Sequence, residues 1–168
     1  RGPSNLSMEI ISTDITENQF WDRGLVNGVE YHYRIGVETL AGLELSENLT
    51  AVPHTVPDRP QALAAEGELG YIRLNWSAPA DDGGAEVLGY KVYMSSDGRT
   101  PGHLADVQGT GYICSGLSEG SRYLFQVSAV NRAGEGERSG VVNETCGLVP
   151  SAPDGPSAEA GDGYVVLS

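Results

Sequence analysis

Residues 117–134 read LSEGSRYLFQVSAVNRAG, and this stretch decides the fold class. From Tyr123 to Ala129, bulky or apolar side chains recur at every second position, so a β-strand would place them all on one face. Just upstream, the spacing Leu-x-x-Gly-x-x-Tyr predicts a corner. Gly120 allows a tight turn there, and Tyr123 can bury its ring while its hydroxyl reaches the backbone. The stretch therefore predicts a core strand of an all-β protein.

The same pattern occurs earlier in the chain, where residues 25–42 read LVNGVEYHYRIGVETLAG. The Leu, the Gly, the Tyr and the closing Ala-Gly recur at one spacing, and Tyr31 lies 92 positions before Tyr123. A fixed period of this size predicts an array of similar small domains.

At these residues the sequence resembles the fibronectin type III family. Further matches are Trp76, the run LGYKV at residues 88–92 and the run NRAGEG at residues 131–136. The resemblance implies a β-sandwich of about seven strands per module. We therefore expect an all-β chain of tandem immunoglobulin-like (fibronectin type III) sandwiches, one complete and two partial.

Two proline-rich segments, residues 55–60 and 148–156, predict stiff linkers and thus domain boundaries. Residues 1–56 are expected to be the C-terminal part of a module, with strands at 8–11, 31–37 and 43–52. Residues 57–149 are expected to form a complete module, and residues 150–168 the N-terminal strands of a third, with a strand at 164–167. Such pieces suggest a window cut from a longer array, with exchange of strands between chains as the alternative.

Within the complete module, we expect strands around Leu63, at 72–76, at 88–92, from Tyr112, at 123–129 and at 141–142, with Trp76 at the centre of the core. Asp97-Gly98 predicts a hairpin turn. The resemblance implies that any binding would use two loops, residues 79–87 and 131–136. The candidate residues in them are Asp81, Asp82, Gly83, Gly84, Asn131 and Arg132.

The composition excludes several classes of function. The net charge of −13 argues against binding nucleic acid or anionic lipid, both of which need a basic surface, and it is typical of a soluble acidic coat. No run of about 18 apolar residues predicts a membrane span. Asp81-Asp82 supplies too few oxygens for calcium, and the histidines lack metal-ligand spacing. No catalytic motif is present, so we expect no enzyme, no cofactor and no metal.

Asn-x-Ser/Thr occurs four times, at Asn5, Asn48, Asn75 and Asn143. The pattern favours an N-glycosylated protein, although chance matches on Ser- and Thr-rich strands are the alternative. Asn75 should face outward if Trp76 faces inward, because strand residues alternate.

The two cysteines, Cys114 and Cys146, are too few for a disulfide-rich framework. They could pair with each other, pair with another chain or stay free. The resemblance places them on strands of opposite sheets that are not neighbours, so we favour two unpaired, partly buried thiols.

Together these features predict a non-catalytic structural or adhesive spacer in a long extracellular surface protein or filament. The expected partners are other modules of the same chain or of neighbouring copies, together with N-linked glycans. Two alternatives are an accessory module of a secreted carbohydrate-active enzyme and an intracellular cytoskeletal array.

Overall fold

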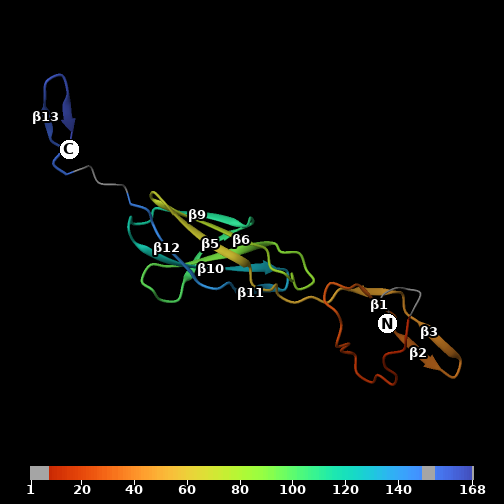
Figure 1. The fold of residues 1–168 in the computed structure, drawn as a ribbon. Helices are drawn as coiled ribbons and strands as arrows, with labels where there is room; N and C mark the ends of the chain where they lie inside the picture. The colour runs from red at the N-terminus through yellow and green to blue at the C-terminus, as the bar shows by residue number, and fades with distance from the viewer. Residues whose placement is uncertain (1–7, 149–153, 168) are drawn as a thin grey trace.

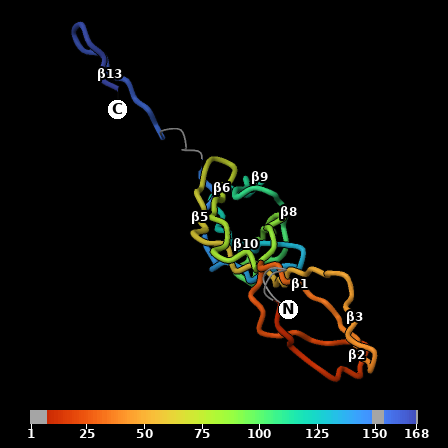
Figure 2. The backbone as a smooth tube through the Cα atoms, turned by 90° about the vertical axis from the view of Figure 1, so that its right-hand side faces the viewer, coloured from red at the N-terminus to blue at the C-terminus, as the bar shows by residue number. Residues whose placement is uncertain are grey.

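The computed structural model describes residues 8–148 and 154–167, and all regular structure in this part of the chain is β-strand. Figures 1 and 2 show three parts that follow one another along an extended path: a loosely built N-terminal part, a sandwich and a C-terminal hairpin. The all-β prediction is confirmed.

The middle part is a sandwich of two antiparallel sheets. One sheet has the order β5-β6-β9, and in the other β10 lies at the centre, paired with β7, β11 and β12, while β8 pairs with β7. The strands are β5 (Gln61–Glu68), β6 (Tyr71–Ser77), β7 (Gly89–Ser95), β8 (Gly102–Val107), β9 (Gly111–Ser115), β10 (Arg122–Asn131), β11 (Gly134–Arg138) and β12 (Val142–Thr145).

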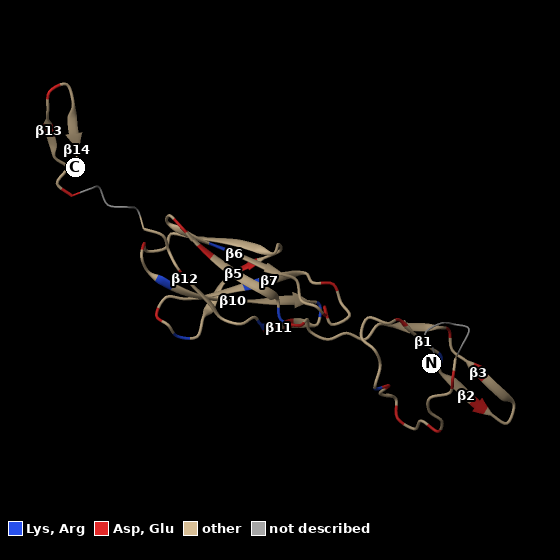
Figure 3. Ribbon diagram, in the orientation of Figure 1, with Lys and Arg blue, Asp and Glu red and all other residues tan. Residues whose placement is uncertain are grey.

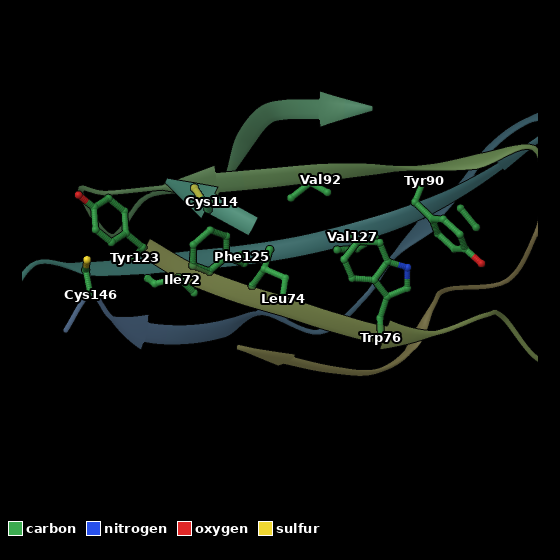
Figure 4. Close-up of a cluster of buried hydrophobic side chains, with 11 residues drawn as sticks. Ile72, Leu74, Trp76, Tyr90, Val92, Cys114, Tyr123, Phe125, Val127 and Cys146 are labelled. Atoms are coloured by element: carbon green, nitrogen blue, oxygen red, sulfur yellow. The ribbon is translucent and has the colours of Figure 1, made fainter. Parts of the chain in front are cut away.

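Every second side chain of the central strands enters the core between these sheets (Figure 4). Phe125 and Val127 on β10 are fully buried, and Tyr123 and Ala129 are also buried, as the alternation predicts. Trp76 is 6% exposed and meets Tyr90 edge-on at 5.5 Å between ring centres. It lies toward one end of the cluster rather than at its centre, which corrects the prediction. The remaining core members are Ile72, Leu74, Val92, Cys114 and Cys146.

The corner predicted at residues 117–123 is present. Gly120 has a φ of +68°, and the Tyr123 hydroxyl accepts a 2.9 Å hydrogen bond from the Ser118 backbone N–H. The earlier copy is built alike, because Gly28 has a φ of +80° and the Tyr31 hydroxyl accepts from the Val26 N–H at 3.1 Å. Both corners therefore have the same structure, a glycine with positive φ and a Tyr hydroxyl that accepts from a backbone N–H, in agreement with the 92-residue spacing.

Some predicted strand limits in the sandwich are wrong. Leu88 precedes β7 and is 60% exposed, although its N–H donates to the Val130 carbonyl beside the strand end. Val141 is exposed and precedes β12. Strand β10 continues to Asn131, so the turn expected over 131–136 is only the two residues 132 and 133.

The N-terminal part, residues 8–56, has two separate strand pairs and no buried residue. β1 (Tyr31–Tyr33) pairs with β4 (Leu49–Ala51), and β2 (Gly36–Thr39) pairs with β3 (Gly42–Leu45). The single strands expected at 31–37 and 43–52 are therefore each broken. At the break, the Ile35 N–H donates to the Ser46 hydroxyl and the Ser46 N–H donates to the Ile35 carbonyl.

No strand forms at residues 8–11, contrary to the prediction, because no neighbouring strand pairs with them. In the C-terminal part, β13 (Ala158–Ala160) and β14 (Val165–Leu167) form a hairpin whose residues are all exposed. Neither terminal part has a core of its own among the described residues.

Candidate functional site

The two candidate binding loops lie at the end of the sandwich that faces the N-terminal part. They are the β6–β7 loop (residues 78–88) and the β10–β11 turn, taken together with Asn131 at its start. The loop and Asn131 both contact the linker, which we define as residues 52–60 between β4 and β5. The structure thus brings together five of the six predicted loop residues, whereas Arg132 is exposed in the β10–β11 turn.

Local side-chain bonds shape the β6–β7 loop. The carboxylate of Asp81 accepts a hydrogen bond from the Gly83 N–H, and that of Asp82 accepts one from the Gly84 N–H, each at 2.8 Å. Both glycines have positive φ, +74° and +77°. Short turns of this kind need Asp or Asn followed by residues without a Cβ, so the run Asp-Asp-Gly-Gly encodes the loop.

Asn131 ties the loop, the turn and the linker together, and it is only 3% exposed. Its Nδ2 donates to the carbonyls of Thr55 and Asp82, both at 2.7 Å. Its Oδ1 accepts from the N–H groups of Ala133 at 2.8 Å and Gly134 at 3.3 Å. Its amide is thus fully used, as a buried polar group requires.

The linker runs through this junction in an ordered path. The Thr55 N–H donates to the Gly83 carbonyl at 2.8 Å, and the Asp58 N–H donates to the Asp81 carbonyl at 2.9 Å. Pro57 between them is fully buried. The backbone of the linker is therefore paired with the β6–β7 loop much as one strand is paired with another.

The two parts also meet directly at two glycines. A Cβ on Gly84 would lie 2.2 Å from the backbone nitrogen of Gly28, which is the corner glycine of the N-terminal part. A Cβ on Gly28 would in turn lie 3.2 Å from Gly84 Cα. Only residues without a side chain permit this approach.

Two of the four candidate glycosylation sites are open to solvent on the sandwich. Asn75 is exposed on β6, as the alternation predicts, and Asn143 is exposed on β12. The Oδ1 of Asn143 accepts a 3.1 Å hydrogen bond from the Arg122 guanidinium, which leaves its Nδ2, the atom that carries a glycan, unengaged by that contact.

Asn48 is placed differently. It is half-buried, its Nδ2 lies 3.0 Å from His32 Nδ1, and its buried Oδ1 has no hydrogen-bond partner. Its amide nitrogen is therefore engaged in the folded protein. Asn5 lies outside the described residues.

Sequence reasoning missed a polar cluster on the outer face of the larger sheet. Glu135 on β11 accepts hydrogen bonds from the Tyr93 hydroxyl, the Ser128 hydroxyl at 2.7 Å and Lys91 Nζ at 3.0 Å. The Arg138 guanidinium covers the ring of Tyr93 at 3.5 Å from its centre. Burial alone would raise the pKa of Glu135, but these three donors and the charge of Lys91 lower it to about 2.

A weak signal for this cluster exists in the sequence. Lys91 and Tyr93 alternate with core residues, so they must face outward. Their partners depend on the register, which sets Ser128 opposite Lys91 and Val130 opposite Glu135, next to a bulge in β11. Sequence alone does not fix such a bulge.

Both thiols are free and buried, in keeping with the preferred prediction. Cys114 Sγ lies 3.6 Å from Met94 Sδ, and Cys146 Sγ lies 3.8 Å from the Glu68 carbonyl. Burial raises the pKa of the Cys114 thiol, with a smaller contribution from Cys146. Such a thiol behaves as an apolar core group rather than as a nucleophile.

Acidic residues are spread over loops and strands of all three parts rather than gathered in one patch (Figure 3). Within residues 8–148 and 154–167, no group of three or more His, Cys, Asp or Glu is arranged to hold a metal ion. No helix long and apolar enough to cross a bilayer occurs in the same described residues.

Comparisons with known proteins agree with this architecture. The chain is 30% identical to human (Homo sapiens) myomesin-2 over 131 residues, which is 73% of this chain and 9% of that protein. It is 31% identical to mouse (Mus musculus) protein sidekick-1 over 142 residues, which is 78% of this chain and 6% of that protein. The chain thus spans less than a tenth of the length of either relative.

Two solved structures share the fold. A crystal structure of consecutive titin domains matches with a TM-score of 0.61 at 20% identity, covering 74% of this chain and 44% of that one. Domains d3-d4 of the extracellular region of rat CD45 match with a TM-score of 0.58 at 15% identity, covering 83% and 75%. The family model described as fibronectin type III domain matches residues 58–145, just over half of the chain. The chain therefore belongs to the fibronectin type III family.

Proposed function

We propose that this chain is a spacer segment of a long, extracellular, glycosylated surface protein or filament. Family membership and the similarity to myomesin-2 and sidekick-1 support a structural module. The proposal adds the non-catalytic role, the location, the glycans and the adhesive setting.

The observation that carries the proposal is the serial arrangement of the parts. The sandwich is joined at its N-terminal end to a second corner-bearing part by a linker with an ordered, hydrogen-bonded path. Residues 8–56 have no buried side chain, which fits the C-terminal part of a module whose other strands come from elsewhere. We accordingly assign residues 1–56, 57–149 and 150–168 to three successive modules.

The glycosylation part of the proposal rests on accessibility. Asn75 and Asn143 are exposed, and their side chains leave opposite sheets of the sandwich. A glycan on either strand would stand in solvent without displacing the core. We expect the partners to be neighbouring modules, in the same chain or in adjacent copies.

The test is the intact mass of the protein isolated from its native source, before and after treatment with an N-glycosidase. We expect the enzyme to reduce the mass of the unaltered protein. The loss should be smaller by the mass of one glycan in Asn75→Gln, and likewise in Asn143→Gln. In the control Asn48→Gln, whose amide nitrogen is already engaged by His32, the loss should equal that of the unaltered protein. An identical mass before and after treatment would refute the extracellular, glycosylated assignment.

A second candidate is an intracellular cytoskeletal array, and the free, buried thiols favour it, because disulfides are rare in reducing compartments. It requires the same serial modules but no glycan. The glycosidase experiment therefore separates the two candidates.

A further inference from the structure

We propose that the β6–β7 loop and the β10–β11 turn form a receptor for the linker of the preceding module, which holds the two modules in one orientation and closes this end to outside ligands. The inference rests on the proposed division into modules but not on the proposed location. It differs from the expectation that the family resemblance gave, in which the same loops would bind an external partner.

The first support is the completeness of the hydrogen bonding. Both backbone groups of Thr55 are bonded to the sandwich, the N–H to Gly83 and the carbonyl to Asn131. Without the linker, one of the two donors of a 3% exposed Asn131 amide would lose its partner. A buried donor that depends on the linker indicates that the loop end is built for the occupied state.

The second support is steric. A Cβ on Gly83 would lie 2.3 Å from the Thr55 carbonyl oxygen, and a Cβ on Gly136 would lie 2.0 Å from that of Pro57. Together with the contact of Gly84 on Gly28, this makes three positions at which any side chain would displace either the linker or the preceding module. The glycines therefore shape a surface complementary to one particular stretch of backbone.

The consequence is a joint with little freedom. The N–H groups of Thr55 and Asp58 bond to the β6–β7 loop, and the Thr55 carbonyl bonds to Asn131. Pro57, which lies between Thr55 and Asp58 in the chain, is fully buried. A ligand that approached the loops would have to displace Thr55 first. Any binding of an outside partner by this module is thus directed to the faces and edges of its sheets.

The test uses hydrogen exchange measured by NMR on the full chain. Gly83→Ala adds a methyl group that meets Thr55, whereas the control Gly98→Ala adds one at nearly the same φ, +75° against +74°, with no atom within 4 Å. We expect amide exchange at Thr55 to be at least about tenfold faster in Gly83→Ala, with Val127 in the core strand unchanged and both amides unchanged in Gly98→Ala. An unprotected Thr55 amide in the unaltered chain would overturn the inference, as would equal effects of the two variants.

A second variant keeps the test decisive if Gly83→Ala does not fold. Asn131→Asp retains the oxygen that accepts from the turn but replaces the donor with an oxygen that faces the carbonyls of Thr55 and Asp82. We expect the same faster exchange at Thr55 and a wider spread of module orientations in residual dipolar couplings. Unchanged exchange and couplings would overturn the inference. None of these amides reports on glycans, so the joint and the proposed location succeed or fail separately.

Discussion

Replacing Glu135 by Gln should destabilise the sandwich by an amount that depends on pH. The pKa of Glu135 falls from its usual 4.5 to about 2, which corresponds to roughly 3 kcal/mol at about 1.4 kcal/mol per pKa unit. Because 31% of the side chain is exposed, screening by water reduces the expected loss to about 1–2 kcal/mol at pH 7.

The direction of the pH dependence follows from the lowered pKa. A carboxylate that ionises more readily in the folded state contributes stability above pH 4.5, and this contribution is lost as the pH falls toward 2. The free energies of unfolding of the two proteins should therefore differ by a constant amount at neutral pH and converge between pH 4.5 and 2.

The assay is urea unfolding followed by the fluorescence of Trp76, which is buried, while Trp21 is 73% exposed and gives a nearly constant background. Glu137→Gln is the matched control on the same strand, since the Glu137 side chain is 74% exposed and pairs with an exposed Arg59. It should change stability by less than about 0.5 kcal/mol. A difference for Glu135→Gln that persists at pH 2, or one no larger than the control, would refute the electrostatic account.

Three further substitutions or treatments test the core and the corner. Phe125→Ala removes a fully buried ring and should lower the free energy of unfolding by about 3–5 kcal/mol in the same urea experiment. Tyr123→Phe removes the hydroxyl that accepts a corner N–H and should cost about 1–2 kcal/mol; Tyr31→Phe, its counterpart in the part without a core, should leave the unfolding of the sandwich unchanged. Cys114 and Cys146 should resist a thiol reagent in the native protein and react fully in denaturant, and rapid native labelling would contradict their burial.

The features that could be predicted from the sequence are those set by local pattern. Alternation from Tyr123 to Ala129 places side chains by the geometry of a single strand, and the Gly-x-x-Tyr corner is a local turn. The resemblance to the fibronectin type III family then predicts the sandwich. None of these predictions requires knowing which residues distant in the sequence lie nearby in the fold.

The errors arise where tertiary context decides. Met8–Ile11 has the composition of a strand, but a strand needs a partner to satisfy its backbone, and no strand within residues 8–148 and 154–167 pairs with this segment. Residues 31–37 break in two because Ser46 bonds across the break at Ile35. Strand propensity alone does not contain this information.

The candidate site shows the same division. A loop that contains Asp81 to Gly84 follows from the sequence, since the hydrogen bonds that shape it are local. The hydrogen bond from Asn131 to Thr55, which lies 76 positions earlier in the chain, depends instead on how the linker packs against the sandwich. The cluster around Glu135 likewise required the register of three strands.

The joint also bears on how this module is excised for study. The family match starts at Asp58, one residue after the fully buried Pro57 and three after Thr55, whose carbonyl accepts from Asn131. A fragment trimmed to the matched residues would expose the pocket left by the proline ring and open one end of the sandwich to water. A piece that keeps these contacts begins upstream, at or before Thr55, whose N–H donates to the Gly83 carbonyl and whose carbonyl accepts from Asn131. The hydrogen bonds that complete this end of the sandwich therefore begin upstream of the residue at which the family match starts.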